Sequence, residues 1–127
     1  MTCVLEPQEG KPDRKVYSIT DAGRAALGDW FDQPTAHPTV RDEFSAKLMA
    51  CSVQPSAPYR HQLAQLVEES RKLVAHYKEI EAAYYATPST LDKQGRLERL
   101  TLRRNLMLRE TWINWADEVL AELEALG

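Results

Sequence analysis

The sequence predicts a mainly α protein in which an N-terminal β-hairpin is followed by long antiparallel helices. Two short β-prone runs flank a turn-rich segment near the N-terminus. A heptad pattern then runs through residues 59–84, and a second apolar periodicity continues almost to the C-terminus. Because a long amphipathic helix buries its apolar side against another element, we expect the helices to form most of the core.

The hairpin is predicted from its turn chemistry. Residues 3–5 (Cys-Val-Leu) and 16–19 (Val-Tyr-Ser-Ile) are β-prone, and residues 7–13 between them contain two prolines and one glycine. Thr20 is a good N-cap for a helix from Asp21 to about Phe31, because its hydroxyl can accept a hydrogen bond from a free backbone N–H group. The strands should therefore lead directly into a helix.

The middle of the chain predicts a short helix and then a long one. Residues 33–39 contain two prolines and end the first helix, and a short helix is expected over Val40 to about Val53. After a linker at residues 55–58, a helix should run from Pro58 to about Ala86. Its apolar positions alternate in steps of four and three, which predicts a seam packed lengthwise against another helix. The seam comprises Tyr59, Leu63, Leu66, Ser70, Leu73, Tyr77, Ile80 and Tyr84, and Val67 and Val74 widen it.

The last helix should end at Leu126 and begin soon after Thr90, or at Arg96 if Gly95 delays it. At about 100° per residue its apolar residues fall into two stripes. One stripe usually suffices for one partner, so we expect two partners, namely the preceding helix and a second copy of the chain in a coiled-coil-like homodimer. The residues predicted for dimerisation are Leu102, Leu106, Leu108, Trp112, Ile113, Trp115, Val119, Leu120 and Leu123.

Charge on the last helix is divided. Residues 91–109 contain six basic and two acidic residues, whereas residues 110–127 contain five acidic and no basic ones. This order opposes the helix macrodipole. Antiparallel packing against a second copy would place each basic half beside an acidic half. Two solvated faces remain the alternative explanation.

No residue pattern predicts an enzyme, a metal site or a cofactor. His37, His61 and His76 are scattered, and neither a zinc-binding HExxH motif nor a Gly-rich phosphate loop occurs. Apolar runs are too short to span a membrane. Cys3 and Cys51 have no near partner and no CxxC spacing, which indicates reduced thiols, so we expect a cytoplasmic protein. A net charge of −3 disfavours a free-standing nucleic-acid binder.

The N-terminal segment resembles the wing of a winged-helix regulator of the PadR family. The matching pattern is Gly, a basic residue, Pro, a variable residue, Arg-Lys, an aromatic residue, and Thr before Ala-Gly. It is carried by Gly10, Lys11, Pro12, Arg14, Lys15, Tyr17, Thr20 and Gly23. The remaining chain is similar to the helical C-terminal domain of that family, and the helix-turn-helix that precedes the wing in the family is absent from this sequence.

The resemblance implies three regions and a function in transcription. Residues 1–32 are the remnant of a winged-helix DNA-binding domain, residues 33–57 a linker with a short helix, and residues 58–127 a dimerisation domain. Lys11, Arg14 and Lys15 would contact DNA, weakly without the helix-turn-helix. In small PadR-like repressors, flat aromatic compounds bind in an apolar cavity at the dimer interface, so the resemblance implies that Trp30, Trp112 and Trp115 line a cavity for a small aromatic effector. Simple core packing is the alternative explanation for these tryptophans.

The expected activity is that of a repressor, of which this chain carries the wing and the dimerisation domain. Two explanations of the absent helix-turn-helix stay open: the reading frame continues upstream of Met1, or the chain is a short natural protein. In the second case the alternative function is a dimerisation protein that does not bind DNA and modulates a full-length regulator. No membrane association is expected.

Overall fold

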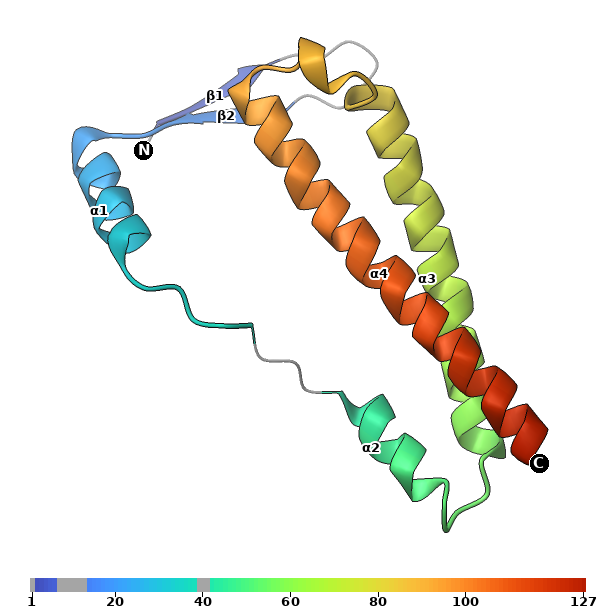
Figure 1. Ribbon diagram of the computed structural model, residues 1–127. Coiled ribbons are helices and arrows are strands. Elements are labelled where there is room, and N and C mark those ends of the chain that lie inside the picture. Colours follow the sequence, from blue (N-terminus) through green and yellow to red (C-terminus); the bar gives the residue numbers. More distant parts are fainter. Residues whose placement is uncertain (1, 7–13, 39–41) are drawn as a thin grey trace. The chain divides into compact units, whose positions relative to one another are not determined.

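The computed structural model describes residues 2–6, 14–38 and 42–127 (Figure 1). Their elements follow in the order β1, β2, α1, α2, α3, a short 3-10 helix (Pro88–Thr90) and α4. The chain divides into two compact units, residues 1–40 and residues 41–127. Each unit is described by itself.

The first unit contains two strands and one helix. Strand β1 (Thr2–Glu6) pairs antiparallel with β2 (Arg14–Ser18), with Thr2 opposite Ser18 and Val4 opposite Val16. Helix α1 (Asp21–Asp32) follows, and the Thr20 hydroxyl accepts a 3.1 Å hydrogen bond from the Gly23 N–H group. The predicted N-cap is therefore confirmed.

The predicted fold class needs a correction at this end of the chain. The strand pair was expected to be the wing of a winged helix, but it is a sheet of only two strands among the described residues, and α1 has no buried residue. A wing is part of a packed domain, and a two-stranded hairpin is marginal alone. The described residues of this unit do not form a winged-helix core. Over the part of the chain that the structure describes, the fold is mainly α, with four α-helices.

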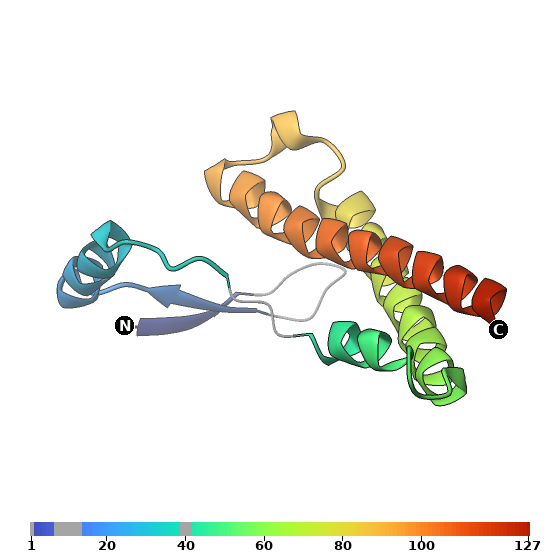
Figure 2. The same cartoon turned by 60° about the horizontal axis from the view of Figure 1, so that its bottom comes forward.

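The second unit consists of α2 (Glu43–Ala50), α3 (Ala57–Tyr84) and α4 (Lys93–Leu126). Figures 1 and 2 both show α3 and α4 side by side and running in opposite directions. Their facing sides bury a continuous apolar core. It comprises Tyr59, Leu63, Val67 and Val74 of α3 together with Ile113, Ala116, Val119 and Leu123 of α4.

The heptad seam of α3 faces α4 only in part. Tyr59, Leu63 and Ser70 are buried, as are Val67 and Val74, but the later seam members Tyr77 and Tyr84 are not. An α-helix has 3.6 residues per turn, so a strict seven-residue repeat drifts by about 20° per heptad. The drift turns part of the seam, including Leu66 and Tyr77, from the core toward one flank of the helix pair.

Helix α4 begins earlier than the alternative start at Arg96. It starts at Lys93, because the Asp92 side chain caps it by accepting a 2.8 Å hydrogen bond from the Gly95 N–H group. A Cβ atom at position 95 would lie 3.1 Å from Asp92 Oδ1 and 3.3 Å from Leu91 Cβ. Glycine therefore fits this tight first turn instead of delaying the helix.

Candidate functional site

The two flanks of the α3–α4 pair differ in chemistry. One flank has ion pairs between the helices: Arg71 Nη2 lies 2.5 Å from Asp117 Oδ2, Lys78 Nζ lies 3.1 Å from Glu110 Oε1, and Arg103 Nη1 lies 3.4 Å from Glu81 Oε2. These side chains are between 29% and 60% exposed, so each pair contributes about 1 kcal/mol or less. Their main effect is to fix which residues of α3 and α4 stand opposite one another.

The opposite flank carries an open groove of about 670 Å³. Leu66, Tyr77, Leu108 and Trp112 give it an apolar wall. Its polar members, Ser70, Asn105 and Arg109, come from both helices. Leu66 and Leu108 remain 36% and 54% exposed. The groove is thus lined by both apolar and polar side chains, a cation and an amide among them, and has no cover among the described residues.

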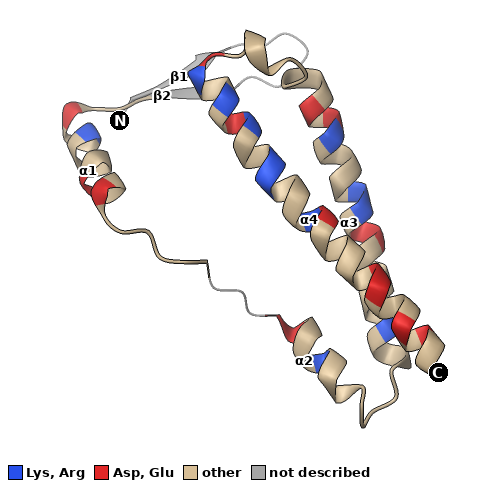
Figure 3. Cartoon of the chain, in the orientation of Figure 1, with Lys and Arg blue, Asp and Glu red and all other residues tan. Residues whose placement is uncertain are grey.

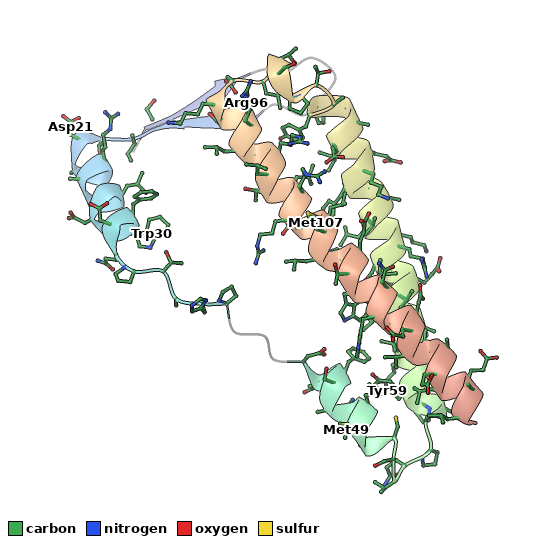
Figure 4. The ribbon with its side chains drawn as sticks, in the orientation of Figure 1. Asp21, Trp30, Met49, Tyr59, Arg96 and Met107 are labelled. Atoms are coloured by element: carbon green, nitrogen blue, oxygen red, sulfur yellow. The ribbon has the colours of Figure 1, made fainter. Side chains whose placement is uncertain are left out.

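Helix α2 packs beside this groove. The Phe44 ring lies 5.8 Å from the Tyr59 ring and 6.3 Å from the Trp112 ring, in the second case nearly edge to face. The Tyr59 hydroxyl donates a 2.9 Å hydrogen bond to the Phe44 carbonyl oxygen. Figure 4 labels Tyr59 where α2 meets α3. Burial, and then the nearby Cys51 and Asp42, raise the pKa of Tyr59.

An apolar strip continues from the groove along the solvent side of α4. Leu97, Leu100, Met107 and Leu108 are each between 54% and 56% exposed. Large apolar surfaces of this kind mark protein interaction sites in soluble proteins. We call these four residues, together with the groove, the apolar flank.

Comparison with known proteins identifies the family to which the chain belongs. Residues 40–124 match the family model described as the virulence activator alpha C-terminal domain. The probable transcriptional regulator Rv1176c of Mycobacterium tuberculosis is 34% identical over 128 residues, covering 92% of this chain and 67% of the relative. The negative transcriptional regulator PadR of Bacillus subtilis is 26% identical over 122 residues, covering 92% and 66%. The chain belongs to the PadR family of transcriptional regulators.

Two solved structures are similar to this chain. The virulence activator AphA of Vibrio cholerae is 81% identical, with a TM-score of 0.82 over 88% of this chain and 66% of that one. Bacillus subtilis PadR in complex with operator DNA has a TM-score of 0.69 at 22% identity, over 96% and 70%, and shows the fold alone. The chain therefore spans about two thirds of the length of the curated relatives it matches.

The residues predicted for dimerisation of this PadR-family chain lie in two environments. Leu106, Ile113, Val119 and Leu123 are buried inside the unit, where α3 and α4 pack together. Leu102, Trp112, Trp115 and Leu120 are half-buried, and Leu108 is exposed. The two predicted stripes therefore mix residues of the intrachain core with exposed and half-buried ones, and dimerisation itself stays a prediction.

The residues predicted to contact DNA and those predicted to line an effector cavity lie on different elements of the chain. Lys11 lies outside the described residues, whereas Arg14 and Lys15 lie in β2, opposite Glu6 and Leu5. Among the tryptophans, Trp112 lines the groove and Trp115 packs against the core. Trp30 belongs to the other unit and is 68% exposed. The effector cavity stays a prediction, now with a defined groove around Trp112.

Sequence reasoning missed the groove and the docking of α2. A short helix was expected in this region, but only the structure shows that its residues Phe44 and Leu48 pack against the core. Across residues 2–6, 14–38 and 42–127 no three metal-ligating side chains cluster. Over the same residues, none of the helices has the length and hydropathy to cross a membrane.

Proposed function

We propose that this chain supplies the dimerisation part of a PadR-family transcription regulator. The observation that carries the proposal is the apolar flank of the second unit, where Leu97, Leu100, Met107 and Leu108 lie exposed on one helix. Covering such a surface is favourable by about 25 cal/mol per Å² of apolar area removed from water. A second copy presents the same surface, which suits a two-fold symmetric dimer.

Sedimentation of the 127-residue chain tests the proposal. The expected mass is twice 14.5 kDa. Leu108→Asp places a charge in the apolar flank and should shift the chain toward monomer. Val53→Asp is the matched control, because Val53 is exposed just after α2 and lies outside that flank. A wild-type chain that stays monomeric at high micromolar concentration contradicts the proposal.

We also propose that the regulator acts on operator DNA, with Lys11, Arg14 and Lys15 as phosphate contacts. Support comes from the PadR structure that was solved with operator DNA. In the strand pair Arg14 stands opposite Glu6 and Lys15 opposite Leu5. Fluorescence anisotropy with a promoter fragment should give weak binding that falls steeply with salt. Arg14→Ala and Lys15→Ala should weaken it, and unchanged affinity in both variants rules out this role.

Whether the regulator represses or activates transcription is part of the same proposal. Repression was expected from the resemblance, and Bacillus subtilis PadR is named a negative regulator. The structure neighbour at 81% identity is named an activator, which favours activation by the proposed regulator at some promoters. A promoter–reporter fusion in cells with and without the regulator decides between the two, since deletion lowers the output of an activated promoter and raises that of a repressed one.

A second function uses the same surface. The apolar flank could pair with a longer PadR-family protein, and the chain would then modulate that protein instead of binding DNA itself. Mixing the two proteins and measuring the operator affinity of the longer one distinguishes the cases. Loss of operator binding on addition of the chain, abolished by Leu108→Asp, supports modulation, and an unchanged affinity contradicts it.

A further inference from the structure

The 3-10 helix before α4 and the first turns of α4 form a pocket that shares no residue with the groove. This pocket has a volume of about 410 Å³ and is lined by Pro88, Ser89, Arg96, Arg99 and Leu100. The first two belong to the 3-10 helix and the other three to α4. Figure 4 labels Arg96 near the start of α4. Two guanidinium groups and a hydroxyl group thus line one pocket together with two apolar side chains, and we call it the arginine pocket.

The two arginines of this pocket lack a counter-charge within the described part of the chain. Neither of them forms an ion pair there. Arg96 donates a 3.3 Å hydrogen bond from Nε to the Leu91 carbonyl oxygen. Arg99 is half-buried, and its Nε atom is shielded from solvent without an acceptor among the described residues. Because removing a charged group from water is unfavourable unless a partner compensates it, a bound anion would stabilise Arg99.

The carboxylates around the start of α4 are already engaged. Glu98 accepts hydrogen bonds from the Tyr85 hydroxyl at 3.1 Å and from Gln94 Nε2 at 2.9 Å. The Asp92 side chain caps the first turn of the helix. Glu81 of α3 pairs with an arginine outside the pocket. An anion for the arginine pocket therefore has to come from outside these residues.

The positions of the two arginines on α4 add to the local positive potential. Side chains three residues apart on a helix are neighbours, and like charges placed in this way repel one another. The start of a helix also carries a partial positive charge, which favours anions over cations. Figure 3 shows basic residues toward the start of α4 and acidic residues toward its end. Binding of an anion between Arg96 and Arg99 would relieve both repulsions.

We propose that the arginine pocket binds a small molecule through a phosphate monoester group. Such a group carries about −1.5 to −2 charges at pH 7 and three acceptor oxygens, which suit two guanidinium groups and the Ser89 hydroxyl. Guanidinium groups bind phosphate through two parallel N–H donors. Pro88 and Leu100 contact the body of the ligand, and the pocket volume lies in the range of small-molecule sites.

Isothermal titration calorimetry of the full chain with phenyl phosphate tests the proposal. Saturable binding at millimolar concentration or below is expected, whereas phenol should not bind and benzoate, with one charge and two oxygens, should bind more weakly. Arg96→Gln and Arg99→Gln should each weaken phenyl phosphate roughly tenfold, because each removes a charged hydrogen-bond donor. Arg99→Lys keeps the charge but not the paired donors, so it should also bind less tightly than the wild type.

Arg104→Gln is the matched control for these variants. It removes the same charge from an exposed position of α4 that does not line the pocket, and it should leave the affinity nearly unchanged. Circular dichroism checks that every variant is folded. The absence of saturable binding in the wild type, or equal weakening by Arg104→Gln and Arg99→Gln, overturns the proposal.

The arginine Nε–H signals in nitrogen–proton correlation NMR spectra locate the bound phosphate. The Arg99 signal should shift as phenyl phosphate is added. Arg60 provides an internal reference, because its Nε is likewise shielded and unpaired among the described residues but lies outside the pocket. Equal shifts of both signals would contradict binding at the arginine pocket.

The DNA backbone also carries phosphate, and a competition experiment separates the two sources. A short DNA duplex at the same phosphate concentration should not displace phenyl phosphate, since each phosphodiester carries a single charge. Displacement that is lost in Arg99→Gln would assign the pocket to DNA and overturn the small-molecule ligand. The pocket is formed by one chain, so the inference does not rest on the proposed dimer. A monomeric wild type that binds phenyl phosphate would contradict only the dimer.

Discussion

Arg71 of α3 and Asp117 of α4 form a 2.5 Å ion pair, and the spacing of this pair repeats in the next one along the helices. Moving seven residues toward the C-terminus of α3 and seven toward the N-terminus of α4 gives Lys78 and Glu110, which form the second pair at 3.1 Å. Because the two pairs are one heptad apart on both helices, α3 and α4 keep one antiparallel register between them on this flank. The opposite flank has no such ladder among the described residues and holds the groove instead.

The Arg71–Asp117 pair should contribute little to stability. Both side chains are about half exposed, so Asp117→Ala should lower the free energy of unfolding by about 1 kcal/mol or less. Urea denaturation of Arg71→Ala, Asp117→Ala and the double variant measures the coupling between the two residues. A coupling well above 1 kcal/mol would show that the pair is shielded from solvent in the native protein.

Core packing should dominate the stability of the second unit. Leu63 is fully buried among apolar residues, and Leu63→Ala should cost about 2–5 kcal/mol because it leaves a cavity. Leu97→Ala is the matched control, since Leu97 is 56% exposed, and in the monomer it should change stability by only about 0.5 kcal/mol. Urea denaturation at protein concentrations below the dimer dissociation constant measures the free energy of unfolding of both variants. Equal losses of this free energy would contradict the assigned core.

Some of this fold could be predicted from the residues alone. The N-cap at Thr20, the break around the prolines of residues 33–39 and the long helix after Pro58 follow from local chemistry. The rotation of the α3 seam did not, because steps of three and four cannot distinguish a straight helix from a supercoiled one over a few turns. The role of Arg103 also escaped prediction, since its partner Glu81 lies on another helix.

The candidate site was predictable to a smaller extent. Leu108 and Trp112 were both expected at an interface, and both line the groove. Whether an apolar residue of α4 faces α3 or solvent depends on how α4 is rotated about its own axis. That rotation is set by the packing of both faces of the helix together. Phe44 was missed as a neighbour of Trp112, because contacts between helices far apart in sequence leave no local pattern.

Stability should fall at alkaline pH because of Tyr59. Burial raises its pKa above the ordinary value of 10.0, so the folded protein retains the phenol proton where the unfolded chain loses it. The contribution is fully present below pH 10.0, and it declines as the pH rises from there through the folded-state pKa. Burial and the hydrogen bond to Glu98 raise the pKa of Tyr85 in the same direction.

Tyr59→Phe separates the two effects of this residue. Losing the hydrogen bond to the Phe44 carbonyl should cost about 0.5–1.5 kcal/mol at neutral pH and speed amide exchange in α2. The alkaline loss of stability should become shallower, with Tyr85→Phe as the matched control that leaves α2 unchanged. Urea denaturation between pH 8 and pH 11 gives the profile, and an identical slope in Tyr59→Phe and the wild type would contradict the assignment.

Flat aromatic molecules should bind in the groove beside Trp112. Its wall combines Leu66, Tyr77 and Leu108, which suit an aromatic ring, and Arg109 stands at the edge to pair with a carboxylate. Hydroxycinnamic acids or planar dyes should therefore quench tryptophan fluorescence saturably. Trp112→Phe should remove most of this quenching, whereas Trp30→Phe, on the exposed surface of α1, should leave it unchanged. Arg109→Gln should weaken the carboxylates more than uncharged dyes. The absence of saturable quenching up to millimolar ligand would exclude the groove as an effector site, and the apolar flank would then remain available only to protein.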